Sequence, residues 1–218
     1  MNTNKLKINT NNLKTKTMKI NYFNTMKTTN FFISAIFCLA LTTSCSNDDD
    51  ANPLPINPEE LITNVTLTFT NNADATDTIV LESVAPDGQD GASTETVTGD
   101  FTSGATYALS LEITNESEDP ADDVLNDDII PEADEHFFTY AVNPSNLTMT
   151  RDGDDIEGPN GSKLGVNTTW VAGDVSTGNN VQIILIHEPT STDDSNGFGS
   201  VTGGSEDLNI TFTSVDIQ

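Results

Sequence analysis

The sequence predicts an all-β fold, a two-sheet antiparallel β-sandwich with an immunoglobulin-like topology as its leading form. The first observation is a run in which Val65, Leu67 and Phe69 alternate with threonines, the period of two that a half-buried strand requires. The second is a series of turn-forming pairs that contain glycine, at residues 87–88, 152–153, 160–161, 196–197 and 203–204. The third is that helical periodicity is nearly absent.

The remaining strands are each short, rich in β-branched or aromatic residues and bounded by turn residues. We expect them at residues 78–81, 106–113, 136–142, 147–150, 167–171, 181–187 and 208–217. One short helix is expected within residues 121–130, where apolar residues are spaced among acids, and Pro131 would end it.

Charge divides the chain into two different parts. Six of the eight basic residues precede Cys45, and no Asp or Glu does. After Cys45, Arg151 and Lys163 stand against 34 carboxylates, a formal charge of −32. Such a domain repels phosphate backbones, so nucleic acid is excluded as a partner.

Residues 26–44 have the organisation of a lipoprotein signal peptide. Lys27 gives the positive end, residues 31–41 form an apolar run shorter than the ~20 residues of a spanning helix, and small residues precede Cys45. The Leu-Thr-Thr-Ser-Cys stretch at 41–45 resembles a bacterial lipobox, although its leucine stands one place further upstream than usual. We predict lipidation at Cys45 and a location at the bacterial outer membrane or cell surface. The alternative is an ordinary cleaved signal with a leftover thiol.

Four segments follow from this assignment. Residues 1–25 are an Asn/Thr/Lys-rich extension, interpreted as non-native or disordered, and residues 26–44 are the signal. Residues 45–58 form an acidic, proline-containing linker whose first acids resemble the tag that directs many flavobacterial lipoproteins to the cell surface. Residues 59–218 form the acidic β-sandwich domain. Cys38 lies within the signal, so we expect no disulfide.

Four stretches of the domain resemble a known protein family. They are Glu-Glu-Leu-Ile-Thr at 59–63 through Phe69, Glu-Ala-Asp-Glu-His-Phe-Phe at 132–138, His-Glu-Pro at 187–189, and Gly203-Gly204 with Asp207. They are similar to flavobacterial lipoproteins of unassigned activity that are often labelled with a type 1 periplasmic-binding-fold name. The chain departs from that family at Ile186, usually basic, at Ser205, usually acidic, and in lacking a lysine soon after residue 189. The label implies strands alternating with long helices, whereas the sequence pattern favours an all-β fold.

Two histidines are the candidate ligands for a transition metal. His136 follows Glu135 and His187 precedes Glu188, so two converging strand ends would combine imidazoles with carboxylates, a set that zinc or copper accepts. The alternative is that each histidine is a core or edge residue with one satisfied hydrogen bond, because no local spacing fixes both ligands.

An acidic loop is a second candidate, for calcium. Asp152, Asp154 and Asp155 flank a glycine and offer hard oxygen ligands. The alternative is that acidic turns are simply common in an acidic protein.

No catalytic motif accompanies these residues. A nucleophile needs an activated Ser, Cys or Lys beside a base, and no Gly-x-Ser-x-Gly elbow or equivalent occurs. We therefore expect a non-catalytic binding domain, anchored to the membrane by lipid, with a divalent cation or an envelope protein as its partner. One alternative is a structural or adhesive accessory without a small-molecule site, and a more distant one is a carboxylate-based hydrolase.

Overall fold

The computed structural model describes residues 60–144 and 146–218, which belong to one compact unit, Asn57–Gln218. The predicted extension, signal peptide, lipidated Cys45 and linker lie outside the described residues. The buried apolar residues of this unit form one cluster that runs from Ile62 to Ile217, so the unit has a hydrophobic core of its own.

A six-stranded antiparallel sheet forms one layer. Its order is β3-β2-β1-β4-β7-β6, with β1 Asn64–Asn71, β2 Thr78–Val84, β3 Thr94–Thr98, β4 Thr106–Thr114, β6 Leu147–Arg151 and β7 Thr168–Ala172. Along β1 the side chains alternate between buried and half-buried, and Val65, Leu67 and Phe69 point into the core, as their spacing predicts.

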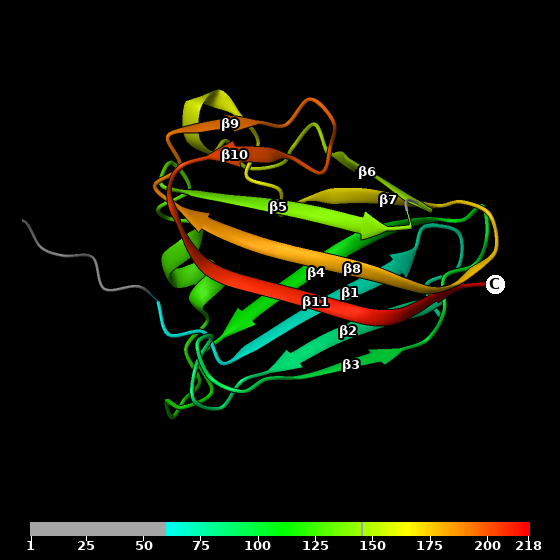
Figure 1. Cartoon of the computed structure of the whole chain (residues 1–218), viewed down its shortest axis with the longest axis horizontal. Coiled ribbons are helices and arrows are strands. Elements are labelled where there is room, and N and C mark those ends of the chain that lie inside the picture. Colours follow the sequence, from blue (N-terminus) through cyan, green and yellow to red (C-terminus); the bar gives the residue numbers. More distant parts are fainter. Residues whose placement is uncertain (1–59, 145) are drawn as a thin grey trace, which may run out of the picture. The chain divides into compact units, whose positions relative to one another are not determined.

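A three-stranded sheet forms the facing layer. Its order is β11-β8-β5, with β5 His136–Asn143, β8 Ser176–His187 and β11 Ser205–Ile217. In Figure 1 these three strands cross in front of β1 and β4, which run diagonally behind them. A small hairpin, β9 Ser191–Asp193 and β10 Ser200–Thr202, lies along the β5 side.

Aromatic side chains fill the space between the layers. Trp170 is fully buried and makes edge-to-face contacts with Phe69 and with Tyr140, at 5.3 and 5.6 Å between ring centroids. Because Trp170 belongs to the six-stranded sheet and Tyr140 to the other, their contact joins the two sheets, whereas the contact with Phe69 lies within the six-stranded sheet.

The outer face of β5 is covered as well, which is unusual for a small sandwich. Phe137 is fully buried there beneath the guanidinium of Arg151, whose carbon lies 4.4 Å from the ring centroid. Arg151 donates hydrogen bonds to the backbone oxygens of Gly197, Lys163 and Phe138 at 2.8, 2.6 and 2.6 Å. Burial lowers the pKa of the guanidinium. The arginine therefore ties β5 and β6 to two loops at the β5 end of the sheet.

These observations confirm the all-β prediction and correct its detail. The immunoglobulin pattern passes from one sheet to the other after its second strand, whereas β1 to β4 here all lie in one sheet, with β1 in its interior. The helix expected at 121–130 is a single π-helical turn, Leu125–Ile129. In the part of the chain that the structure describes, no helix has the length and apolar character needed to cross a bilayer.

Candidate metal centre

The two histidines lie opposite each other at one end of the three-stranded sheet. His136 is the first residue of β5 and His187 the last of β8, and the antiparallel register pairs them directly. Their rings stack in parallel, with centroids 4.8 Å apart and an interplanar angle of 14°. The His136 ring is fully buried and the His187 residue is 7% exposed. Strand pairing thus joins residues that are 51 positions apart in sequence.

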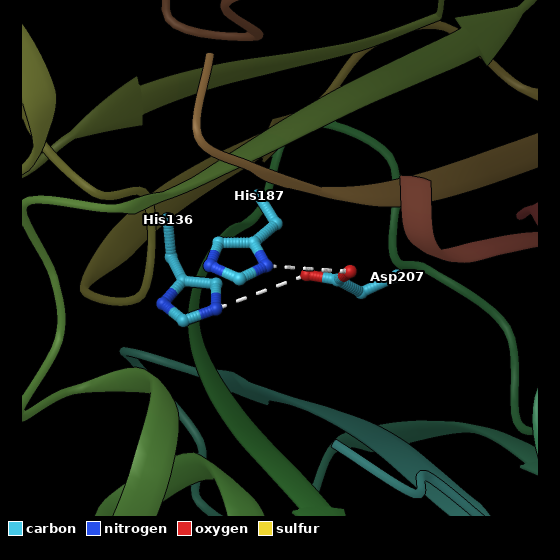
Figure 2. A group of neighbouring side chains, drawn as sticks. All are labelled: His136, His187 and Asp207. Atoms are coloured by element: carbon cyan, nitrogen blue, oxygen red, sulfur yellow. Dashed lines mark ion pairs between the residues drawn. The ribbon is translucent and has the colours of Figure 1, made fainter. Parts of the chain in front are cut away.

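Asp207 faces this pair from the third strand. The β11–β8 register shifts between Glu206 and Leu208, so Asp207 lies at a β-bulge and is buried directly beside the buried Leu208. A bulge breaks the alternation of a strand, and here it turns a carboxylate inward at the histidine end. Figure 2 shows the carboxylate at the edge of the two stacked rings.

Glycine at position 204 allows β11 to begin this close to the end of β8. Its φ is +85°, and a Cβ there would stand 2.5 Å from the backbone oxygen of His187 and 2.6 Å from Ile186 Cγ2. Both the left-handed backbone and the close approach require the absence of a side chain. Gly204 therefore sets the position from which Asp207 reaches the histidines.

The distances within the cluster are longer than hydrogen bonds. His136 Nε2 lies 3.8 Å from Asp207 Oδ2, and His187 Nδ1 lies 4.0 Å from Asp207 Oδ1. Hydrogen bonds between nitrogen and oxygen span about 2.7–3.2 Å. The facing atoms are therefore close to one another without being in direct hydrogen-bond contact.

Glu60 provides a second carboxylate. Its Oε1 lies 3.8 Å from His136 Nε2, and its side chain is 7% exposed. The segment is fixed by Gln89, whose side-chain nitrogen donates to the Glu60 backbone oxygen and whose side-chain oxygen accepts from Ile62 N. The Gln89 clamp holds a carboxylate against the histidines although Glu60 precedes the first strand.

Each histidine ring contacts an oxygen acceptor on the side that faces away from Asp207, and these contacts indicate which ring nitrogen carries the proton and which carries the lone pair. His136 Nδ1 lies 3.1 Å from the backbone oxygen of Glu132, and a carbonyl oxygen can only accept, so Nδ1 is the donor. His187 Nε2 lies 3.4 Å from Glu135 Oε2, a longer and weaker contact in which the carboxylate oxygen can likewise only accept. In neutral rings the opposite nitrogens, His136 Nε2 and His187 Nδ1, then present lone pairs to the carboxylates. Metal-binding histidines are held in this way by outer oxygen acceptors.

Two buried atoms of the cluster stand out among the described residues. His136 Nε2 is inaccessible to solvent and has no hydrogen-bond partner there, and the same is true of Glu60 Oε2. A buried polar atom without a hydrogen bond costs about 1–3 kcal/mol, so most are satisfied. A metal ion between these atoms would satisfy them.

The electrostatic field at this end of the domain is negative. Asp128, on the π-helical turn, has a raised pKa, caused first by burial and then by the carboxylates of Asp122 and Glu60. The field that disfavours another carboxylate there favours a cation.

The predicted ligands Glu135 and Glu188 lie on the outer side of His187. One atom each from Glu135, His187 and Glu188 lies within 4.8 Å of the others, and the same holds for the inner group of His136, His187 and Asp207. Glu188 is exposed, and the Glu135 side chain is 45% exposed. The structure therefore divides the predicted set into a buried group and a surface group that share His187.

The carboxylates of the predicted calcium loop do not converge on a common point. Among the described residues, neither group of clustered ligands includes Asp152, Asp154 or Asp155. Asp155 turns inward, and its carboxylate accepts hydrogen bonds from the backbone N–H groups of Gly165, Val166 and Asn167. Asp152 accepts from the Thr169 hydroxyl. These carboxylates bind the chain itself.

Sequence reasoning did not assign Asp207 or Glu60 as ligands. Asp207 fits the polar, outward phase of the alternating run at 208–212, so the sequence pattern predicts an exposed side chain there. The glycine pair at 203–204 is the one nearby sign of an irregular strand. Glu60 is one of two adjacent acids ahead of the first strand, and nothing in that pattern distinguishes it.

The donor set matches a small divalent transition metal. Two imidazole nitrogens and two carboxylate oxygens are ligands that zinc accepts in a tetrahedron, where neighbouring ligand atoms lie about 3.4 Å apart. The donors of His136, His187 and Asp207 already lie within 4.8 Å of one another, whereas Glu60, 3.8 Å from His136 Nε2 but outside that group, would have to move inward to complete the tetrahedron. A 2+ ion with Asp207 and Glu60 also makes a neutral buried group. Calcium prefers six to eight oxygens, which this cluster does not supply.

Comparison of the chain with profiles of known protein families, with curated proteins and with solved structures gave no match. The resemblance to flavobacterial lipoproteins stays a prediction. The geometry of this cluster is therefore the main indication of what the domain does.

Proposed function

We propose that this protein is a lipid-anchored envelope or cell-surface protein whose β-sandwich binds one divalent transition-metal ion, zinc or copper, without catalysing a reaction. The ligands are His136, His187, Asp207 and Glu60. The observation that carries the proposal is His136 Nε2, a fully buried nitrogen that faces two carboxylates at 3.8 Å and has no hydrogen-bond partner among the described residues.

A binding role is favoured over catalysis because the inner ligands are buried and a fourth carboxylate lies beside them. Catalytic zinc keeps one coordination position for water or substrate, whereas structural sites fill all four with protein. Here the donors of His136, His187 and Asp207 lie within 4.8 Å of one another, and Glu60 lies beside His136 as the nearest further carboxylate. All four side chains are at most 9% exposed. The ion would be held within the protein and would join β5, β8, β11 and the segment before β1.

The envelope location rests on the N-terminal sequence. A basic, apolar and small-residue signal ending at Cys45 is followed by a domain of charge −32. Outside the cytoplasm such a polyanionic domain concentrates cations near its surface, which favours a role in metal binding.

Calorimetric titration of residues 57–218 with zinc, copper and calcium tests the metal assignment. We expect one zinc or copper ion per chain and no calcium at this centre. Glu60→Gln, which replaces a ligand with a neutral amide, is expected to weaken binding, whereas the same change at the exposed Glu118 leaves it unaltered. Melting curves without metal verify that both variants fold. Neither heat nor a melting shift with zinc or copper would reject the proposal and leave the accessory role as the better explanation.

The anchor is tested separately on the full chain in a bacterial host. Cys45→Ala is expected to abolish labelling with a fatty-acid analogue and retention in the membrane fraction. Unchanged partitioning of the variant would contradict lipidation at Cys45.

A further inference from the structure

A surface group of ligands, Glu135, His187 and Glu188, adjoins the buried centre. Glu135 and Glu188 are the next residues beyond the paired histidines, and Glu188 N donates to the Glu135 backbone oxygen at 2.7 Å. Glu188 has a φ of +49°, so the chain turns away from the strand there. Both carboxylates are solvent-accessible, and Glu135 Oε2 lies 3.4 Å from His187 Nε2.

His187 is the residue that both groups share. Its Nε2 faces the surface carboxylate, and its Nδ1 faces the buried Asp207 at 4.0 Å. A neutral imidazole has one lone pair, so His187 can coordinate an ion on only one side at a time. The surface and buried groups are therefore alternative positions for a single ion.

We propose that Glu135, Glu188 and Nε2 of His187 form a capture site for the divalent metal ion, from which the ion passes to the buried centre as the His187 ring loses its proton from Nδ1 to water and gains one from water at Nε2. This inference rests on the proposed metal-binding function. The exposed carboxylates meet a hydrated ion first, and the buried ligands replace its remaining water afterwards. The capture site speeds exchange in both directions and leaves the final affinity to the inner ligands.

Stopped-flow measurement of zinc uptake by residues 57–218, with a zinc-sensitive dye as competitor, tests the proposal. The variant is Glu135→Gln with Glu188→Gln, in which the amide oxygen at 135 still accepts from His187 Nε2. The matched control is Glu112→Gln with Glu118→Gln, two exposed acids whose loss changes the net charge equally. We expect the association rate of the variant to fall about tenfold or more relative to the control, within the range by which local fields raise on-rates.

The dissociation rate should fall by the same factor, because Kd and the stoichiometry of one zinc ion stay those of the unmodified chain. Rates equal to those of the control would overturn the capture site. A weaker Kd with faster dissociation would show instead that these carboxylates are ligands in the final complex, and two ions per chain would show that the groups fill together. Each of these results leaves zinc binding intact, whereas an unmodified chain that binds no zinc would overturn the metal-binding function as well.

Discussion

Asp207→Asn is the sharpest single change to the proposed centre. Asp207 is the residue whose carboxylate faces both histidines, with one oxygen toward each ring. Asparagine keeps the size of the side chain and removes its charge, so it separates the loss of a ligand from the loss of packing. We expect it to abolish most of the thermal stabilisation that zinc confers.

The magnitude follows from ligand linkage. Free zinc at about 100 times Kd stabilises the folded state by about 2.7 kcal/mol. In a domain of this size, each kcal/mol raises Tm by about 2–4 °C, so the unmodified domain should gain about 5–11 °C. Loss of a residue that only orients a metal ligand can weaken binding by about 100-fold, so loss of a ligand should weaken it at least as much. A variant that binds zinc about 100-fold more weakly has a ratio of free zinc to Kd of about one. The stabilisation then falls to about 0.4 kcal/mol and the gain in Tm to about 1–2 °C.

Differential scanning calorimetry of residues 57–218, with and without zinc, measures both shifts. Asp174→Asn is the matched control, because Asp174 is exposed and precedes β8 at the end opposite His187, and its zinc-dependent shift should equal that of the unmodified domain. If Asp207→Asn keeps the full shift, Asp207 is not a ligand and the reasoning from this cluster is refuted.

Three further predictions concern the scaffold around the centre. Asp155→Ala leaves up to three backbone N–H groups without their acceptor and should lower the free energy of unfolding by about 3 kcal/mol or more in a urea titration. The pKa of Asp77 is held below its usual value, first by the hydrogen bond from Asn71. The ionised carboxylate therefore stabilises the fold at any pH above the usual pKa of an aspartate, and this stabilisation is lost as the pH falls through the lowered pKa of Asp77. Asp77→Asn should therefore destabilise the domain at pH 7, and melting curves across an acid series should show the deficit shrinking. Gly204→Ala places a methyl group against the His187 backbone, so calorimetry should show both a lower Tm and weaker zinc binding, whereas Gly104→Ala, at a similar φ of +77° but with open space around it, should lower Tm alone.

The strands with strong alternation were predictable and the weak ones were not. The apolar period of two in β1 specifies its buried face, and the structure confirms it. β3 has one apolar side chain, Val97, and is largely exposed at the edge of its sheet, while β9 and β10 are three residues each. Such strands are defined by their pairing partners, which local composition does not reveal.

The two histidines of the candidate site could be predicted from the sequence, but their contact with each other could not. Both histidines lie at strand ends, yet only the β5–β8 register determines that they face each other. A shift of one residue would turn one ring to the opposite face. Asp207 depends on a bulge and Glu60 on the Gln89 clamp, and both are long-range features.

The interior position of Arg151 has a consequence for proteolysis. After Cys45 the chain offers a trypsin-like protease two cleavage points, Arg151 and Lys163. Arg151 is 6% exposed, with its guanidinium held by backbone oxygens, and Lys163 is half-buried with its ammonium donating to the Asp152 backbone oxygen. Cutting at Arg151 therefore has to wait for the fold to open, and its rate reports the free energy of that opening. A chain so poor in basic residues resists this class of secreted protease through its composition as well as its stability.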